Sequence, residues 1–491
     1  MSELPAGWAL ARLEDLAELN PKQSFDDELA AGFVPMSHAP TNFRDKLRFD
    51  ERPWGEIKKA YTNFKDGDVI FAKVTPCFEN GKAAFVEGMP NGIGAGSSEF
   101  FVLRPSCDGV SAKYLLALVK SHDFLSEGAE NMTGAVGLRR VPKQFVESYL
   151  VPVPPAAEQT RIAQKLDELL AQVDTLKARI DAIPALLKRF RQSVLAAAVS
   201  GRLTEKWREV NSASETGLDV IKRDQLAKQA LLEEQPELKK KKSSIQSEID
   251  EDYLFAIPEG WAFTTWGKIS EWITYGFTRP MPKSESGKKL LTAKDVQRFA
   301  LELVECGLTT TDAFESLSDK DRPQNGDLLI TKDGSIGRAA LVRTEEDFCI
   351  NQSVAVCWLR STAMNKSYLE LLSNSDFTQR FVLDKAQGMA IQHLSIIDFA
   401  KCPVPVPPKS EQDEIVRSVE QLFAFADQLE AKVATAQARI DRLTQSILAK
   451  AFRGELVPQD PNDEPASLLL ERIQAQRAAA PKAKRGRKAS A

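Results

Sequence analysis

The sequence lacks the features that several classes of protein require. No run of about 18 apolar residues occurs, so a membrane-spanning helix is not expected. The opening residues MSELPAGWAL lack a basic segment followed by an apolar one, so no secretory signal is expected. The 3 histidines and 6 cysteines lie far apart without a CxxC pair, which argues against a zinc site and against a disulfide framework. We therefore expect reduced thiols in a cytoplasmic protein.

The motifs of common catalytic sites are missing as well. The sequence contains no GxxxxGK[ST] phosphate loop, no GxSxG turn and no HExxH helix. The glycine-rich stretch 92–96 lacks the acidic residue that a dinucleotide site carries about 20 positions later. Pro155 and Pro408 are followed by Ala and Lys, not by the aromatic residue that holds a flipped base in an amino-methyltransferase. We expect a non-catalytic chain.

The charge gives no sign of a strongly cationic protein. Lys and Arg number 65 against 69 Asp and Glu, for a net charge of −4, and residues 258–400 hold 16 basic and 19 acidic residues. If the chain binds nucleic acid, its cationic surface must be local, or partners must supply part of the field.

What the sequence does contain is an internal repeat with an offset of 253 residues. The offset maps Val151–Pro155 onto Val404–Pro408, Pro5-x-Gly7-Trp8 onto Pro258-x-Gly260-Trp261, Glu158-Gln159 onto Glu411-Gln412, and Gly201-x-Leu203 onto Gly454-x-Leu456. Matches at both ends of each half indicate duplication of a unit of about 200 residues, which is too long for a solenoid repeat.

Each unit is expected to have a globular part and a helical part. Short β-branched runs such as 68–74 and 327–331, separated by turns such as Asp66-Gly67 and Asn325-Gly326, indicate strands. Helical stretches such as 112–120 and 367–373 make the globular part a mixed α/β domain.

The helical part has a strict heptad pattern with apolar steps of four and three. In both copies this predicts a narrow apolar seam, which two helices bury by coiling about each other. The seam residues are Ile162, Leu166, Leu169, Val173, Leu176, Ile180, Ile183, Leu187, Phe190 and Val194 in the first copy, and Ile415, Val419, Leu422, Leu429, Val433, Ile440, Leu443 and Ile447, with Ala426 and Ala436, in the second.

The two helices are expected to pair antiparallel. The first ends near Gly201 and the second globular domain starts near Pro258, so only an antiparallel pair keeps this connection local, and it puts the two globular domains at opposite ends. Ile162 to Val194 spans about 48 Å, or roughly 14 base pairs, so the helices resemble a ruler. Pro184 should bend the first helix without ending it.

These patterns give a provisional division of the chain. It consists of a first globular domain (1–155), a first helix (156–203), a charged linker (204–257), a second globular domain (258–408), a second helix (409–457) and a C-terminal extension (458–491). In the linker we expect partial helix over Gln225–Leu232 and a mobile stretch around Lys239–Lys242. The tail Ala478–Ala491, with Lys482, Lys484, Arg485, Arg487 and Lys488, is expected to be a disordered solvated tail or a contact to DNA phosphates or the minor groove.

Taken together, the duplicated Gly-Trp start, the Val-Pro-Val-Pro-Pro-x-x-Glu-Gln entry, the heptad helix and the Gly-x-Leu end resemble the specificity subunits of type I restriction–modification systems. In the second copy, Gly334-x-Ile336-Gly337-Arg338, Ile350-Asn351-Gln352 and the stretch 388–394 are also similar to this family. The first copy departs there, with Glu79-Asn80-Gly81-Lys82 and the stretch 134–140, which fits two domains that read different DNA sequences.

The resemblance implies a fold and a set of partners. The fold is two α/β target recognition domains at opposite ends of a two-helix antiparallel coiled coil with a pseudo-twofold internal repeat. Each domain would read half of a bipartite site in double-stranded DNA, and the helices would set the gap and dock two methyltransferase subunits that methylate adenine with S-adenosylmethionine. Restriction subunits that use ATP and Mg would join. The chain itself would hold no cofactor and no metal.

Candidate base readers are the side chains able to reach base edges from turn-rich stretches, because Arg and Lys suit guanine and Asn and Gln suit adenine. They are Lys73, Asn80, Lys82, Arg139 and Arg140 in the first domain and Lys332, Arg338, Gln392 and His393 in the second. Asn351 and Gln352 are expected to brace the fold. Two alternatives stay open: a coiled-coil scaffold that joins two protein- or glycan-binding heads without binding DNA, and a nuclease or methyltransferase with an unfamiliar site.

Overall fold

The computed structural model describes residues 4–135, 137–211, 214–236, 238, 248–388 and 392–479. It divides into two compact units: unit 1 is Met1–Ala182 with Val433–Ala491, and unit 2 is Ile183–Lys432. Each unit contains one globular head and parts of both long helices. No helix of the described residues is long and apolar enough to cross a membrane.

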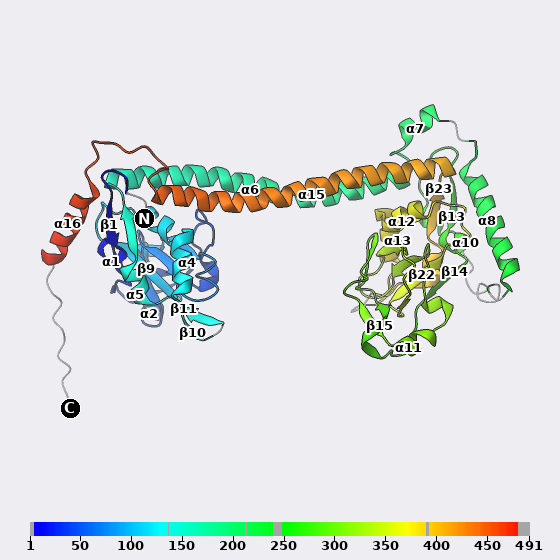
Figure 1. Cartoon of the computed structure of the whole chain (residues 1–491), viewed down its shortest axis with the longest axis horizontal. Coiled ribbons are helices and arrows are strands. Elements are labelled where there is room, and N and C mark those ends of the chain that lie inside the picture. Colours follow the sequence, from blue (N-terminus) through cyan, green and yellow to red (C-terminus); the bar gives the residue numbers. More distant parts are fainter. Residues whose placement is uncertain are drawn as a thin grey trace. The chain divides into compact units, whose positions relative to one another are not determined.

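The head of unit 1 is built from small sheets, most of whose strand pairs are antiparallel although β3 and β8 pair parallel, with short helices beside them (Figure 1). Its elements are β1 (Ala9–Arg12), α1 (Leu13–Leu16), β2 (Ala17–Leu19), β3 (Ala30–Val34), β4 (Asp50–Pro53), α2 (Trp54–Ile57), β5 (Thr62–Lys65), β6 (Val69–Ala72), β7 (Ala83–Phe85), β8 (Ile93–Gly96), β9 (Phe100–Pro105), α3 (Ala112–Val119), α4 (His122–Glu130), β10 (Thr133–Ala135), β11 (Leu138–Arg140), α5 (Lys143–Ser148) and β12 (Leu150–Val153). The main sheet has the order β2-β9-β6-β7 and a second has β4-β3-β8-β5.

The head of unit 2 has the same main sheet with different additions. Its elements are β13 (Ala262–Thr265), α10 (Trp266–Ile269), β14 (Trp272–Tyr275), β15 (Lys283–Leu291), β16 (Val296–Gln297), β17 (Ala300–Leu301), β18 (Gly307–Thr309), α11 (Thr311–Glu315), β19 (Leu328–Thr331), β20 (Ala339–Leu341), β21 (Phe348–Ile350), β22 (Val354–Trp358), α12 (Lys366–Asn374), α13 (Asp376–Asp384), α14 (Ile396–Ala400) and β23 (Pro403–Val406). The order β14-β22-β19-β20 repeats the main sheet of unit 1, whereas the second sheet is β18-β15-β21.

The first and last strands of each head pair in the same register in both copies of the repeat. In unit 1, β1 pairs antiparallel with β12 so that Ala9 lies opposite Val153. In unit 2, β13 pairs with β23 so that Ala262 lies opposite Val406. Both partners are shifted by the 253 residues of the repeat, so the two heads close in the same register.

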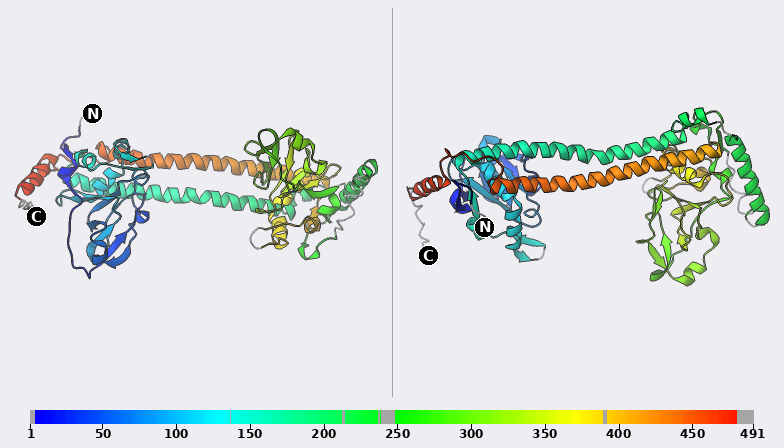
Figure 2. Two further views of the ribbon diagram at one scale, coloured as in Figure 1. Left: turned by 90° about the horizontal axis from the view of Figure 1, so that it is seen from below. Right: turned by 45° about the horizontal axis from the view of Figure 1, so that its top comes forward.

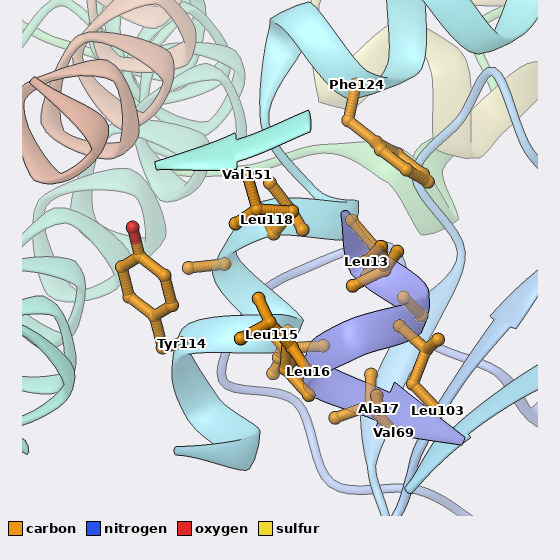
Figure 3. Close-up of a cluster of buried hydrophobic side chains, with 14 of the residues drawn as sticks. Leu13, Leu16, Ala17, Val69, Leu103, Tyr114, Leu115, Leu118, Phe124 and Val151 are labelled. Carbon is orange, nitrogen blue, oxygen red and sulfur yellow. The ribbon is translucent and has the colours of Figure 1, made fainter. Parts of the chain in front are cut away.

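One face of the main sheet of unit 1 packs against helices to form the core of that head (Figure 3). Leu13 and Leu16 of α1 meet Val69 and Leu103 of the sheet, and all four are at most 1% exposed. The core continues into the long helices, because Ile162 and Leu166 of α6 belong to the same buried cluster. Burial of this apolar surface fixes the head against its part of the helix pair.

The helical parts of the repeat form two helices of 44 residues each, α6 (Ala156–Val199) and α15 (Lys409–Phe452). Within each unit they lie side by side (Figures 1 and 2). In unit 1, Lys177 contacts Asp441 and the Gln437 amide donates to Asp181, so a step forward on α6 is a step backward on α15. In unit 2, Arg191 pairs with Asp427 and Glu430 of α15. The pairing is antiparallel, as the sequence predicts.

The heptad seam is unevenly buried. One line of it is buried throughout except for the half-buried Ile180: Leu166, Val173, Leu187 and Val194 on α6, and Val419, Ala426, Val433, Ile440 and Ile447 on α15. On the other line, Ile162 and Ile415 are buried at the helix starts, Leu169, Ile183, Phe190, Leu422, Leu429 and Ala436 are half-buried, and Leu176 and Leu443 are 47% and 44% exposed. A regular two-stranded coiled coil encloses both lines of its seam, so the partial exposure of the second line departs from the even burial that the heptads predict.

Pro184 lies inside α6, and a glycine follows the end of each long helix. Helix α6 continues through Pro184, as expected, while the bend expected there stays a prediction. Beyond the helix ends, Gly201 and Gly454 adopt φ of +75° and +72°, which glycine tolerates without a steric penalty. A Cβ at Gly201 would lie 2.4 Å from Cγ of Pro258, and one at Gly454 would lie 2.5 Å from Cγ of Pro5, so each helix end packs on the start of a head.

The Glu-Gln pair of each repeat joins head to helix. The Gln159 amide donates to the carbonyl oxygen of Pro154 (3.1 Å), and its oxygen accepts from the backbone N–H of Ser111 at the start of α3 (2.9 Å). Gln412 makes the equivalent bonds to Pro407 (2.9 Å) and Asn365 (2.8 Å). These buried amides satisfy backbone groups that would otherwise lose their hydrogen bonds, which is a physical reason for the motif to occur in both copies.

Each unit has a third helix that also belongs to the repeat, although the sequence analysis does not predict this. In unit 2, α8 (Gly217–Glu234) begins with the N–H of Gly217 on the oxygen of Gly260 (2.7 Å), and in unit 1, α16 (Ala466–Ala479) begins with the N–H of Ala466 on the oxygen of Gly7 (2.8 Å). The capping box of Thr216 and Asp219 starts α8 well before the expected helix 225–232.

The contacts along α8 and α16 repeat as well. Arg223 pairs with Glu215 and Arg472 with Glu464, each eight residues back. Near the far ends, Lys228 donates to the carbonyl oxygen of Gly267 and Arg477 to that of Glu14 (3.2 and 2.5 Å). The C-terminal extension therefore includes a docked helix, and the linker also holds α7 (Glu205–Val210). The expected tail falls outside the described residues after Ala479, as do the linker lysines 239–242.

Candidate nucleic-acid interface

In unit 2, two of the predicted side chains, those of Lys332 and His393, gather where β19 ends. Nζ of Lys332 lies 3.3 Å from Asp333 and 5.0 Å from the ring centre of Tyr275. Nδ1 of His393 lies 2.6 Å from Oδ1 of the same Asp333, and the backbone of His393 pairs with that of Asp333. Lys332 is 6% exposed whereas the side chain of His393 is 50% exposed. Asp333 thus holds a buried cation and an exposed imidazole in one cluster.

Arg338 stands at the start of β20, on the neighbouring strand. Its guanidinium donates to the Gln297 side-chain oxygen over 2.9 Å, and its backbone N–H donates to the Thr331 hydroxyl over 3.0 Å. Gly337 before it has φ of +83° and packs against Gln379, which also accepts from Arg298. The guanidinium is partly exposed and is oriented by a neutral amide, so its charge is available to a ligand.

Gln392 completes the predicted set in unit 2. Its side chain is exposed, and its carbonyl oxygen accepts from the N–H of Gly334 (3.0 Å), next to Asp333. Residues 389–391, which belong to the stretch noted in the sequence, lie outside the described residues. The structure therefore brings Gln392, His393 and Lys332 to one edge of the head.

In unit 1, the corresponding edge carries Lys73 and Arg140. The guanidinium of Arg140 makes two hydrogen bonds to the Glu99 carboxylate, of 2.9 and 2.8 Å. Hydrogen bonding by Arg140 lowers the pKa of Glu99, and the nearby Lys73 charge lowers it further. Nζ of Lys73 lies 5.4 Å from the ring centre of Phe101. One carboxylate thus serves two cations, as Asp333 does in unit 2.

The other residues predicted in unit 1 lie close by but are differently engaged. Arg139, on the exposed hairpin β10–β11, pairs with Glu79 (3.2 Å). Asn80 follows Glu79 and is exposed. Nζ of Lys82 donates to the backbone oxygen of Met36 (3.0 Å), so its ammonium is already partly satisfied within the head.

A buried lysine positions this turn. Lys120, which is 4% exposed, donates to the carbonyl oxygens of Thr41 (2.8 Å) and Gly81 (2.9 Å). Burial lowers the pKa of Lys120 to about 7. Its bonds tie the loop around Thr41 to the turn that carries Asn80 and Lys82.

Four pairs of predicted residues occupy equivalent backbone positions in the two heads. The carbonyl of Lys73 accepts from the N–H of Val141, and that of Lys332 from Leu394, each over 2.8 Å. Arg140 and His393 directly precede these donors, and Arg139 and Gln392 precede them by two residues. The pairs are Lys73 with Lys332, Lys82 with Arg338, Arg139 with Gln392, and Arg140 with His393.

The equivalence of Lys82 and Arg338 follows from the backbone hydrogen bonds between neighbouring strands. The N–H of Ala72 donates to the oxygen of Lys82, and the N–H of Thr331 donates to that of Arg338, both over 2.9 Å. Asn80 has no equivalent, because nine positions separate Lys73 from Lys82 and only six separate Lys332 from Arg338. The heads therefore share a backbone frame and differ in the side chains that the frame presents.

Sequence reasoning missed the groups that orient the predicted cations. Glu79, Glu99 and Gln297 come from other turns and strands, so no spacing in the sequence joined them to Arg139, Arg140 or Arg338. Asp333 could have been found, because it directly follows Lys332. Among the described residues no cluster of three or more His, Cys, Asp or Glu could hold a metal ion, and all six cysteines are free thiols.

Comparison with known proteins adds the following. Residues 5–185 and 259–436 match the family described as "Type I restriction modification DNA specificity domain". The chain is 29% identical to the EcoEI specificity subunit of Escherichia coli over 89% of this chain and 81% of that one. It is 30% identical to the EcoAI specificity subunit of Escherichia coli over 89% and 80%. A chain from a structural study of complex assembly and conformational transition of the type I R-M system superposes with a TM-score of 0.62 at 19% identity, over 93% of this chain and all of that chain, which is a likeness of fold.

Proposed function

This chain belongs to the family of type I restriction–modification DNA specificity proteins, and we propose that each of its heads reads one half of a bipartite target in double-stranded DNA. Lys332, Arg338, Gln392 and His393 are the readers in unit 2. Lys73, Lys82, Arg139 and Arg140 are their equivalents in unit 1, with Asn80 as an addition. Arg and Lys suit guanine, and Gln suits adenine, in the major groove.

The observation that supports this proposal is the set of four equivalent pairs. One backbone frame presents Arg139 and Arg140 in unit 1 but Gln392 and His393 in unit 2. A duplicated scaffold with different hydrogen-bonding side chains at matching positions suits two half-sites of different sequence. The carboxylates of Glu79, Glu99 and Asp333 orient these cations until DNA phosphates and bases replace them.

The chain acts through partners rather than by its own catalysis. Two methyltransferase subunits dock on it, bind S-adenosylmethionine and methylate adenine within the target. Restriction subunits that use ATP and Mg join the complex and cleave unmodified DNA. The similarity to the specificity subunits of the type I restriction enzymes EcoEI and EcoAI supports such partners. Since the substrate is the cell's own or invading DNA, the complex works in the cytoplasm.

The helix pair sets the distance between the half-sites. Helices α6 and α15 are continuous over 44 residues each, and paired helices keep a fixed rise of about 1.5 Å per residue. The number of base pairs between the two half-sites is then a property of helix length, independent of the bases that each head reads.

The test is a map of N6-methyladenine in the genome of cells that express the partner methyltransferase with and without this chain. The expected result is a single bipartite motif that appears only with the chain. Arg140→Ala should relax one half of the motif and Arg338→Ala the other. A chain that leaves the methylation map unchanged, and shifts no DNA even with the methyltransferase present, would instead be a scaffold for other ligands.

A further inference from the structure

A cavity of about 750 Å³ opens in the head of unit 2 beside the sheet β18-β15-β21. Its walls come from segments within 277–284, 290–294, 306–308 and 351–352. In Figure 1 this part of the head is found by the labels β15 and α11. The volume lies within the range of about 300–1,000 Å³ that is typical of small-molecule sites.

The charge of the cavity is opposite to that of its surroundings. Arg279, Lys283 and Lys294 line it, and none of the described lining residues carries a carboxylate. Yet the head as a whole, residues 258–400, has more acidic than basic residues. The Arg279 guanidinium is held by the hydroxyl of Ser316 (2.5 Å). Lys294 pairs with the carboxylate of Asp295 outside the lining (3.9 Å), so Arg279 and Lys283 are the cations best able to attract an anionic group of the ligand.

The rest of the wall suits a flat, partly apolar group. Phe277, Leu290 and Leu308 supply apolar surface, and Asn351 and Gln352 supply amides. Oδ1 of Asn351 accepts from both the N–H and the hydroxyl of Ser353, which braces the turn as the sequence predicts. The amide nitrogen of Asn351 has no hydrogen bond to a described residue, and the Gln352 side chain is exposed. Both amides remain able to bond a ligand.

The cavity adjoins the edge that carries the predicted readers. Ser353, which directly follows the two amides, accepts at its carbonyl oxygen from the N–H of Lys332 over 2.9 Å. A DNA strand that crosses Lys332 and His393 can therefore continue into the cavity without leaving the head.

From this combination of cations, apolar wall, free amides and continuity, we propose that the cavity of unit 2 binds one nucleotide of the DNA strand. The phosphate lies on Arg279, Lys283 and Lys294, and the base lies against Phe277 and Leu308 with its edge at Asn351 and Gln352. Aromatic and apolar surfaces hold single nucleotides in this way. The inference rests on the proposed function, because it assigns a second contact to the head that reads DNA. All the lining residues belong to unit 2, so the site serves one half of the target.

Cys306 provides a probe, since this free thiol lines the cavity. The full chain, in complex with its methyltransferase partner, is alkylated at mildly alkaline pH with and without the duplex that carries the mapped target, and modified peptides are quantified by mass spectrometry. The expected result is at least about tenfold slower alkylation of Cys306 with the duplex. Cys107, a free thiol of unit 1, serves as internal control and should react at an unchanged rate.

Variants separate direct contact from remote protection. Arg279→Gln with Lys283→Gln should restore the alkylation of Cys306 and lower the slope of log affinity against log salt by about 1, since the loss of one phosphate contact removes about 0.9. Lys288→Gln is the matched control, because Lys288 lies on the same strand β15 but pairs with Asp347 and does not line the cavity. It should behave like the unaltered chain.

The outcomes distinguish this inference from the proposed function. If the duplex is bound and methylated while Cys306 stays reactive, or if the double variant retains the protection, the cavity does not bind the strand and the proposed function stands. If 5′-deoxyadenylate alone protects Cys306 and the duplex does not, the site takes a free nucleotide and the proposal is overturned. If no duplex is bound at all, the proposed function fails and this inference fails with it.

Discussion

The indole of Trp8 donates a hydrogen bond of 3.1 Å to Oε2 of Glu158, which lies 150 residues later at the start of α6. Trp261 and Glu411 repeat this bond in unit 2, at 2.9 Å and with the same separation. The second carboxylate oxygen differs between the units. In Glu411 it accepts from the Thr204 hydroxyl (2.6 Å) and from the Arg208 guanidinium. In Glu158 it has no donor with hydrogen-bonding geometry among the described residues.

This difference predicts that removal of the carboxylate charge affects the stability of the two units unequally. Burial raises the pKa of Glu158, against the opposing effects of Trp8 and Arg161. Glu158→Gln keeps an oxygen for the indole and removes the buried charge, so the stability of unit 1 at pH 7 should stay within about 1 kcal/mol of the unaltered chain. Glu411→Gln leaves Arg208 without its carboxylate and should cost unit 2 about 2 kcal/mol. Hydrogen exchange of amides in each unit measures both.

The same raised pKa predicts a pH dependence. The folded chain holds the proton of Glu158 to a higher pH than the unfolded chain does, so the contribution of this group is complete below the ordinary carboxyl pKa of about 4.3 and is lost as the pH rises through the folded value. Exchange in unit 1 should therefore speed up with pH, beyond its intrinsic rate, more in the unaltered chain than in Glu158→Gln. Equal pH profiles would show that Glu158 is already ionised in the fold.

Helix α16 is predicted to stabilise the head of unit 1. Ile473 is 2% exposed and belongs to the core cluster of that head, whereas Leu468 on the same helix is 42% exposed. Ile473→Ala should lower the free energy of unfolding of unit 1 by about 2–4 kcal/mol, because it leaves a cavity in the core. Leu468→Ala is the matched control and should change it by less than about 0.5 kcal/mol. If both substitutions had a similarly small effect, helix α16 would contribute little to the stability of unit 1.

Arg338→Ala should weaken recognition at one half-site only. Loss of a base contact of this kind costs about 1–3 kcal/mol, so affinity for the target should fall roughly 5- to 150-fold. A duplex in which the half-site read by unit 2 is already altered lacks this contact, so the variant and the unaltered chain should bind it equally. Arg322→Ala, which removes a half-buried arginine paired with Asp319, is the control. An equal loss on unrelated DNA would identify Arg338 as a phosphate contact.

The length of the helix pair should determine the gap in the target. Seven residues inserted after Ala182 in α6 and seven after Thr435 in α15 preserve the heptad register, because the contact of Asp181 with Gln437 places these points opposite each other. The preferred gap should grow by about 3 base pairs. Methylation mapping with the inserted chain measures it. An insertion in α6 alone should disrupt the pairing, and an unchanged gap after the double insertion would rule out the ruler.

Local patterns were sufficient for the framework. The offset of 253 residues, the heptads and the turn-bounded strands predicted two α/β heads and an antiparallel helix pair, since periodicity reports which face of an element is buried. The candidate readers were also named from residue type and turn context. Their arrangement was not, because Lys73 and Arg140, or Lys332 and His393, are far apart in sequence and are brought together at Glu99 and Asp333 only in the folded chain.

What the sequence by itself determined is thus the repeat and the periodic elements, whose causes lie within a few turns of the chain. Only the tertiary structure decided which groups share a carboxylate, which line of the seam is enclosed and where α8 and α16 dock. The docking shows why: Ile473 is buried in the core of a head whose residues lie hundreds of positions earlier, and Lys228 donates to the carbonyl oxygens of Gly267 and Lys268, about 40 residues later. Long-range burial and hydrogen bonding leave no local period, so they can be found only once the chain has folded.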